Sequence, residues 1–254
     1  MTGSLSDRMV RRFGPGVRSW LSGLDALVAG LCRDWGLEVV RPLSGGTSHA
    51  VWCTRGGEPV VLKVTPEPPI AAQEVAALRA WEPSPRMVRV LEADPARGAL
   101  LLEGLVPGTP AADGPGLAEV LRELHIAPPE GFPPLSERVD FLFGVLRRRH
   151  AGDHDAAHAR AAELARDRVP ATLLHGDLHF GNVLDAGARG LVAIDPRPCV
   201  GDPAVDAVDF AYASPDLRDG IERWSAVVDG DRLAAWCAVF AGFFPGHPSV
   251  AAGR

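Results

Sequence analysis

Residues 173–209 read LLHGDLHFGNVLDAGARGLVAIDPRPCVGDPAVDAVD, and this stretch decides the fold of the chain. An apolar pair opens it, and a turn follows at His175, Gly176 and Asp177. Asn182 stands five residues after Asp177, and a short apolar run typical of a strand then ends on Asp195. The pattern predicts a polar turn followed by a hairpin whose second strand ends on a carboxylate.

The same spacing is the layout that kinase-like enzymes use for phosphoryl transfer. In this layout Asp177 orients the acceptor hydroxyl and takes its proton, and we expect His175 to support the loop rather than act as the base. Asn182 and Asp195 offer oxygen ligands, which Mg²⁺ prefers. Gly176 stands where regulated protein kinases carry an arginine, so we expect no activation by phosphorylation. The stretch predicts an ATP-dependent kinase of small molecules.

Lysine is used once in the whole chain, because 25 of the 26 basic residues are arginine. Lys63 lies in the apolar strand predicted at 60–64, and its compact ammonium suits phosphate oxygens in a tight site. Glu74 follows eleven residues later on the helix predicted at 70–81. In kinase-like folds a helix glutamate pairs with the strand lysine and fixes it on the phosphates. We therefore predict that both residues belong to the nucleotide site.

Two further segments are candidates for nucleotide binding. The turn that contains Ser44, Gly45 and Gly46 can bring backbone N–H groups against triphosphate oxygens, although a plain hairpin turn explains it equally well. Backbone groups near Glu103 and Leu105 are the expected partners of the adenine ring, by analogy with the fold.

Alternation and helical periodicity predict short strands before residue 105 and mainly helices after it. Together with the kinase-like layout of the motifs, this order favours an α+β, two-lobed protein-kinase-like fold. Residues 1–104 would form an N-terminal helix and a small antiparallel-sheet lobe with one key helix. Residues 105–254 would form a larger, mainly helical lobe with the catalytic loop and the acceptor site. The predicted strands are 38–40, 50–54, 59–64, 87–94 and 98–105. The predicted helices are 19–37, 70–81, 116–126, 135–149, 156–168, 221–228 and 231–244.

Charge and composition restrict the partners. The net charge is −6, and from residue 176 onward eleven Asp and Glu residues face six Lys and Arg residues. An acidic second lobe suits a cationic ligand and argues against nucleic acid. No apolar run reaches the roughly 18 residues that span a bilayer, and the N-terminus lacks the apolar core of a signal peptide. Four scattered cysteines suit a reducing compartment, so we expect a cytoplasmic protein without a membrane partner.

Three aspartates after the hairpin are candidates for binding the acceptor. Asp202 lies in a Gly-Asp-Pro turn, where capping a helix that begins near Pro203 is the simpler interpretation. Asp206 and Asp209 lie along the following helix, where they could hold the loop or face the substrate.

Two other chemistries fit the stretch poorly. Zinc could be bound by His175, His179 and Cys199, but Gly176 and Gly181 make the histidine pair part of a loop, and no second ligand pair follows. A Ser-His-Asp hydrolase would need a G-x-S-x-G elbow, and the chain contains none.

The motifs HGDLHFGNVL (175–184) and AIDPRPCVGDPAVD (193–206) resemble those of the aminoglycoside phosphotransferase superfamily, in particular its streptomycin 6-phosphotransferase and hydroxyurea-resistance kinase branch. The resemblance extends to RSWLSGLDALVAGLCRDWGLE (18–38), VVLKV (60–64), EVAALRAW (74–81) and GALLLEGL (98–105), so it covers most of residues 18–240.

This resemblance implies a kinase-like fold, ATP, Mg²⁺ and phosphorylation of a small-molecule hydroxyl. By position it implies that Asp177 is the base, that Asn182 and Asp195 bind metal, and that Lys63 contacts phosphate while paired with Glu74. It also implies an aminoglycoside acceptor such as streptomycin. A kinase of another metabolite or natural-product intermediate is the alternative within the class. A non-catalytic nucleotide-binding relative is disfavoured, because such a protein has no need of a base.

Overall fold

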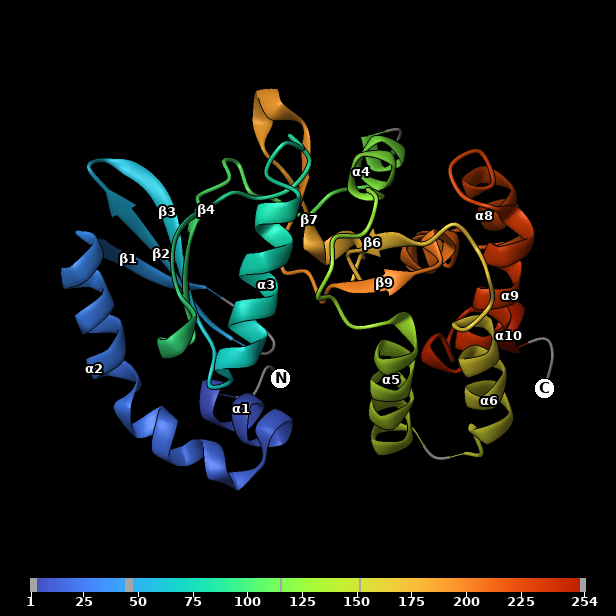
Figure 1. Cartoon of the computed structure of the whole chain (residues 1–254), viewed down its shortest axis with the longest axis horizontal. Helices are drawn as coiled ribbons and strands as arrows, with labels where there is room; N and C mark the ends of the chain where they lie inside the picture. Colours follow the sequence, from blue (N-terminus) through green and yellow to red (C-terminus); the bar gives the residue numbers. More distant parts are fainter. Residues whose placement is uncertain (1–3, 44–47, 115, 151, 252–254) are drawn as a thin grey trace. The chain divides into compact units, whose positions relative to one another are not determined.

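The computed structural model describes residues 4–43, 48–114, 116–150 and 152–251 (Figure 1). The chain divides into two compact units. The N-terminal unit consists of Met1–Glu82 and Val88–Gly108, and the C-terminal unit of Pro83–Met87 and Thr109–Arg254. The boundary predicted at residues 104 and 105 did not foresee that a short upstream segment belongs with the C-terminal unit.

The N-terminal unit is built on a five-stranded antiparallel sheet with the strand order β1-β2-β3-β5-β4. Its strands are β1 (Glu38–Leu43), β2 (His49–Arg55), β3 (Glu58–Val64), β4 (Val90–Asp94) and β5 (Ala99–Glu103). The hairpin between β2 and β3 turns on Gly56 and Gly57, both with positive φ, as the tightest hairpin turns require. Alternate residues of both strands are buried, including Val51 and Leu62, so one face of the sheet forms a core.

Three helices complete this unit: α1 (Leu5–Phe13), α2 (Arg18–Trp35) and α3 (Pro68–Ala80). Leu24 and Leu31 of α2 join the hydrophobic core of the sheet, and α2 ends where Gly36 takes a left-handed conformation. Helix α3 begins with prolines, whose fixed φ suits the first helical turn. It buries Glu74 together with its apolar residues.

The C-terminal unit is mainly helical. Its helices are α4 (Gly116–Leu124), α5 (Leu135–Arg149), α6 (Asp155–Leu164), α7 (Val208–Ala211), α8 (Leu217–Trp224), α9 (Gly230–Phe240) and α10 (Pro248–Ala251). Two small antiparallel sheets complete the unit. One pairs β6 (Thr172–Leu174) with β9 (Cys199–Gly201), and the other pairs β7 (Val183–Asp185) with β8 (Leu191–Ala193). Residues 173–201 run through these two sheets and their connecting loops, and residues 203–209 continue into a 3₁₀ helix and α7.

Several predicted boundaries were wrong. The strand expected at 87–94 begins only at Val90, because Arg189 holds the preceding segment through the carbonyl oxygens of Pro85 and Met87, at 2.7 and 2.6 Å. The helix expected at 221–228 runs from Leu217 to Trp224, because Asp216 caps its N-terminus. The helices expected at 156–168 and 231–244 end earlier, at 164 and 240.

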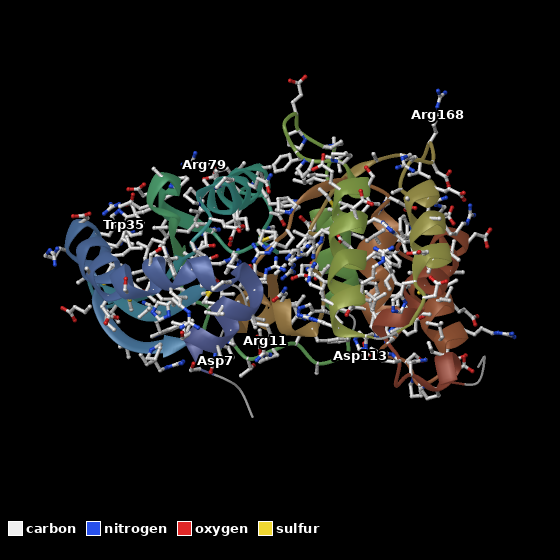
Figure 2. All side chains as sticks on the ribbon, turned by 90° about the horizontal axis from the view of Figure 1, so that it is seen from below. Asp7, Arg11, Trp35, Arg79, Asp113 and Arg168 are labelled. Carbon is white, nitrogen blue, oxygen red and sulfur yellow. The ribbon has the colours of Figure 1, made fainter. Side chains whose placement is uncertain are left out.

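The charged side chains of Asp7, Arg79 and Arg168 are exposed (Figure 2). Within the described part of the chain, no helix has both the length and the apolar character needed to cross a membrane. The four cysteines are free thiols.

Candidate active site

The loop that follows β6 is fixed by its glycine. Leu173 and Leu174 are buried in β6, and the chain then turns sharply at Gly176, whose φ is +74°. A Cβ atom at this position would lie 2.1 Å from the carbonyl oxygen of Arg197. Only glycine fits both the left-handed conformation and this close approach. The glycine in the HGD motif is therefore a requirement of the loop itself.

His175 is fully buried and holds the loop together. Its Nε2 lies 2.9 Å from the carbonyl oxygen of Ile194, and its Nδ1 accepts from the backbone N–H of Asp177 at 3.3 Å. Because a carbonyl oxygen only accepts, Nε2 carries the proton and the ring is neutral. Burial lowers the pKa of His175, which agrees with a neutral ring.

Asp206 clamps the same loop from the 3₁₀ helix Pro203–Ala207. Its two carboxylate oxygens accept from the backbone N–H groups of His175 and Gly176, at 2.8 and 2.9 Å. Burial favours the neutral acid, but His125 and the backbone N–H of Gly176 outweigh it and lower the pKa of Asp206. His125 Nε2 lies 3.6 Å from the carboxylate. Asp206 therefore holds the loop, and it also lines the cavity described below, so a contact with the acceptor stays a prediction.

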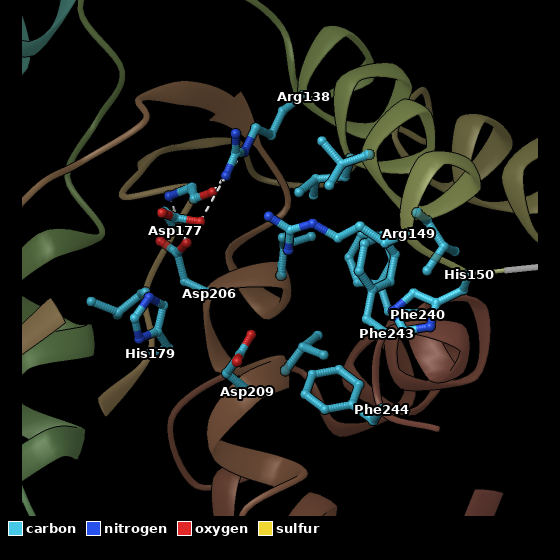
Figure 3. Close-up of a pocket in the computed structure, with 17 residues that line it drawn as sticks. Arg138, Arg149, His150, Asp177, His179, Asp206, Asp209, Phe240, Phe243 and Phe244 are labelled. Atoms are coloured by element: carbon cyan, nitrogen blue, oxygen red, sulfur yellow. Dashed lines mark hydrogen bonds and ion pairs between the residues drawn. The ribbon is translucent and has the colours of Figure 1, made fainter. Parts of the chain in front are cut away.

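The Asp177 carboxylate is partly exposed, with 38% of its side chain accessible. Arg138 of α5 donates from a terminal nitrogen to Asp177 Oδ1 at 2.8 Å, and from Nε to the carbonyl oxygen of Gly176 at 2.8 Å (Figure 3). Arg138 was not among the predicted site residues, because in the sequence it resembles any other arginine on an amphipathic helix. The one feature of the sequence that could have indicated Arg138 is its position on the face of the predicted helix that turns toward the loop.

The pairing of β7 with β8 brings the two candidate metal ligands to one end of a hairpin. The Ile194 N–H, one residue before Asp195, donates to the carbonyl oxygen of Asn182 at 2.9 Å. Asn182 Nδ2 donates to the carbonyl oxygen of Asp177 at 2.8 Å, so Oδ1 is the amide atom that can bind a cation.

Asp195 combines a strained backbone with a charged neighbour. It has a φ of 57°, and no other non-glycine residue among those described has a positive φ. Backbone strain of this kind clusters at functional sites. Arg197 lies 3.3 Å from its carboxylate. One carboxylate and one amide oxygen form the all-oxygen donor set that suits Mg²⁺.

The zinc alternative finds no support in the geometry. Within the described ranges no three His, Cys, Asp or Glu side chains are grouped as metal ligands. Both ring nitrogens of His175 serve the loop, and burial raises the pKa of the Cys199 thiol.

The N-terminal unit holds the predicted lysine and glutamate as a buried ion pair. Lys63 Nζ donates to both carboxylate oxygens of Glu74, at 2.5 and 2.7 Å. The two residues are only 6% and 1% exposed. Lys63 comes from the middle of the sheet and Glu74 from α3, so the pair ties the helix to the sheet.

The other candidate nucleotide residues differ in what the structure describes. Ser44, Gly45 and Gly46 lie outside the described residues. The N–H groups of Glu103 and Gly104 donate to carbonyl oxygens of Arg89 and Pro59. Leu105 N–H has no acceptor among the described residues, so it is the donor in this segment that a base could use.

A cavity of about 330 Å³ opens beside the loop that follows β6, entirely within the C-terminal unit (Figure 3). One face of α5 forms a wall, with lining residues three or four positions apart. The end of α9 and the turn after it supply an aromatic wall of Phe240, Phe243 and Phe244. Asp177 and Asp209 line the same cavity. Its volume lies within the roughly 300–1,000 Å³ typical of small-molecule sites.

The three candidate acceptor aspartates separate in the structure. Asp209 of α7 opens into the cavity, where water reaches it, but the surrounding protein desolvates it and raises its pKa to about 6. Asp202 is not part of the lining, which corrects its place among the acceptor residues. Its carboxylate accepts from Ala204 N–H at 3.0 Å and from Arg232 Nε and Trp236 Nε1, both at 2.7 Å. It caps the 3₁₀ helix and ties it to α9.

Comparisons with solved structures establish the fold. The choline kinase LicA from Streptococcus pneumoniae matches with a TM-score of 0.68 at 14% identity, over 91% of each chain. Aminoglycoside phosphotransferase APH(4)-Ia matches with a TM-score of 0.59 at 15% identity, over 90% of this chain and 93% of that one. The predicted two-lobed, kinase-like α+β fold class is confirmed.

Sequence relatives establish the family. A hydroxyurea phosphotransferase of Kitasatospora aureofaciens is 35% identical over 260 residues, covering 91% of this chain and 75% of that protein. A streptomycin 6-kinase of Streptomyces griseus is 34% identical over 253 residues, covering 90% and 78%. The family described as aminoglycoside/hydroxyurea antibiotic resistance kinase matches residues 35–243. The predicted resemblance and the phosphotransferase class are confirmed, and the chain belongs to the aminoglycoside/hydroxyurea antibiotic resistance kinase family.

Proposed function

We propose that this protein transfers the γ-phosphoryl group of ATP to a hydroxyl of a small cationic molecule, an aminoglycoside of the streptomycin type, and so inactivates the antibiotic. The observation that carries the proposal is the position of Asp177, whose carboxylate lines a cavity of about 330 Å³ together with the acidic Asp209. Relatives named streptomycin 6-kinase and streptomycin 3''-kinase support this choice of acceptor.

In the proposed reaction the acceptor oxygen forms a bond to the γ-phosphorus, the bond from that phosphorus to the β–γ bridging oxygen breaks, and ADP leaves. The acceptor proton passes to Asp177. Arg138 occupies Oδ1 of this carboxylate, so Oδ2 is the atom that would receive the proton. His175 and Asp206 keep the loop backbone in place during the transfer.

Each candidate nucleotide residue has its own proposed role. Lys63, oriented by Glu74, would contact phosphate oxygens, with backbone groups of Ser44, Gly45 and Gly46 as further donors. Leu105 N–H would bond to the adenine ring. Asn182 and Asp195 would hold Mg²⁺, which when bound neutralises charge that develops on the phosphates.

A second acceptor class is favoured by one observation. The guanidinium of Arg149 points into the cavity (Figure 3), and no ion pair joins it to any residue that the structure describes. A polycationic acceptor would meet repulsion there, whereas an acceptor that combines a cation with an anionic group would meet both Asp209 and Arg149. A kinase of such a metabolite is therefore the alternative function.

The substitution Asp177→Asn tests the proposal. Loss of a general base lowers kcat by roughly 10²- to 10⁴-fold, while ATP binding measured by calorimetry should change little. Asp219→Asn is the matched control, because Asp219 is exposed on α8 and does not line the cavity. Turnover by Asp177→Asn close to that of the wild type would remove the assigned base.

A further inference from the structure

Arg138 joins two points of the catalytic loop with one rigid group. Its terminal nitrogen binds the Asp177 carboxylate and its Nε binds the Gly176 carbonyl, both at 2.8 Å. The guanidinium is planar, so the two hydrogen bonds fix the carboxylate oxygen relative to the backbone of the loop. Figure 3 shows both contacts at the wall of the cavity.

Keeping this cation has a cost that needs an explanation. The Arg138 side chain is only 11% exposed. Burial lowers its pKa, and the opposing attraction of Asp177 is smaller. Among the described residues Asp177 is the one carboxylate that forms an ion pair with it. A buried charge is retained when its pairing does something that an apolar side chain cannot do.

The loop backbone has other anchors and does not depend on Arg138. Asp206 accepts from two successive backbone N–H groups, Arg197 N–H donates to the His175 carbonyl oxygen at 2.8 Å, and Gly176 is packed against the Arg197 carbonyl. Arg138 instead restricts the Asp177 side chain, because the χ2 angle of an aspartate without such a partner takes a broad range of values.

We propose that Arg138 is the positioning residue of the catalytic base. It holds Asp177 by Oδ1 against a fixed backbone oxygen, so that Oδ2 faces the acceptor hydroxyl. The inference rests on the proposed function, in which Asp177 is the base. Reacting groups that are misplaced by about 1 Å can lose 10²-fold in rate, which sets the size of the expected effect.

The test compares Arg138→Ala and Arg138→Lys with Arg147→Ala. Arg147 lies on the same helix and forms an exposed ion pair with Asp155, so it controls for loss of an arginine from α5. We expect Arg138→Ala to lower kcat by about 10²-fold with KM for ATP unchanged. Lysine should not restore the rate, because one ammonium lacks the two-pronged geometry. Millimolar guanidinium or ethylguanidinium should partly restore Arg138→Ala in a saturable way and leave Arg147→Ala unchanged.

Two kinetic outcomes overturn the inference. If Arg138→Ala raises KM for the acceptor at an unchanged kcat, Arg138 binds the acceptor instead. If kcat falls together with thermal stability and no guanidinium compound restores it, the role is structural.

A crystal structure of Arg138→Ala gives a readout that needs no acceptor. We expect the Asp177 carboxylate to rotate while both hydrogen bonds from Asp206 to the loop remain. An unchanged Asp177 side chain would overturn the inference. Failure of the proposed function is recognised separately, because the wild type would then phosphorylate no aminoglycoside.

Discussion

At the scale of single residues, the pair of Lys63 and Glu74 explains why this arginine-rich chain keeps one lysine. The pair is buried between the sheet and α3, where a compact ammonium fits and a larger planar guanidinium would require more space. Removing one partner of a buried pair typically costs about 3–5 kcal/mol of stability, because the other charge stays unpaired. The same pair is the proposed phosphate contact.

Lys63→Ala should therefore affect both activity and stability. Loss of a charge-assisted hydrogen bond of about 1.5–3 kcal/mol predicts a fall in kcat/KM for ATP of roughly 10- to 100-fold. Urea unfolding should show a loss of stability that the double variant Lys63→Met with Glu74→Gln recovers in part, without recovering activity. An unchanged kcat/KM for ATP would remove the assigned role of Lys63.

The residues that could be predicted from the sequence are those whose spacing along one segment carries the information. Asp177, Asn182 and Asp195 follow from the hairpin that brings positions 182 and 195 together. Arg138 could not be predicted, because its contact depends on how α5 packs against a loop 38 positions later. Asp202 was assigned in part to the acceptor, although its turn sequence already indicated a cap.

At the scale of elements, the cavity that we propose for the acceptor is assembled from α5, α7, the loop that follows β6 and the end of α9. Helix α7 presents Asp209 to this cavity, and desolvation raises its pKa to about 6. A carboxylate that is kept in an unfavourable setting is a candidate functional group. A bound cationic acceptor would stabilise the charged form of Asp209.

Activity should therefore depend on pH through Asp209. As pH falls through about 6 the carboxylate gains a proton, so KM for a cationic acceptor should rise. Asp209→Asn should show a high KM that no longer changes over this range, whereas Asp219→Asn should behave as the wild type. Steady-state kinetics from pH 5 to 8 measure this. A KM profile of Asp209→Asn identical to that of the wild type would contradict the assignment.

The effect of Asp209 on folding stability has the opposite sign to its proposed effect on acceptor binding, so the two can be measured separately. The folded protein binds this proton more tightly than the unfolded chain, in which aspartate has a pKa of about 4. Stability therefore falls as pH rises from the unfolded pKa to about 6. Above that pH, Asp209→Asn should melt at a temperature equal to or higher than the wild type while binding the acceptor more weakly.

Two elements differ from the prediction for different reasons. The capping box of Ser4 and Asp7 starts α1 and was present in the sequence, but the helix is short and was not predicted. The start of β4 at Val90 depends on Arg189, which is distant in sequence. Tertiary contacts of this kind leave no periodic signal.

At the scale of the whole molecule, each unit carries part of the chemistry that the family implies. The N-terminal unit holds the buried lysine–glutamate pair, and the C-terminal unit holds the proposed base, the candidate metal ligands and the cavity. The fold could be predicted because the order of these motifs along the chain is specific. The identity of the acceptor could not be predicted from the sequence, because the size and lining of the cavity depend on side chains from several helices.

The most direct test of the central claim is the mass spectrum of streptomycin after incubation with the purified protein and Mg·ATP. We expect the drug to gain one phosphoryl group and this gain to disappear with Asp177→Asn. An unchanged drug in the presence of bound ATP would contradict the proposed acceptor and point to another metabolite, and failure to bind ATP would contradict the phosphotransferase mechanism itself.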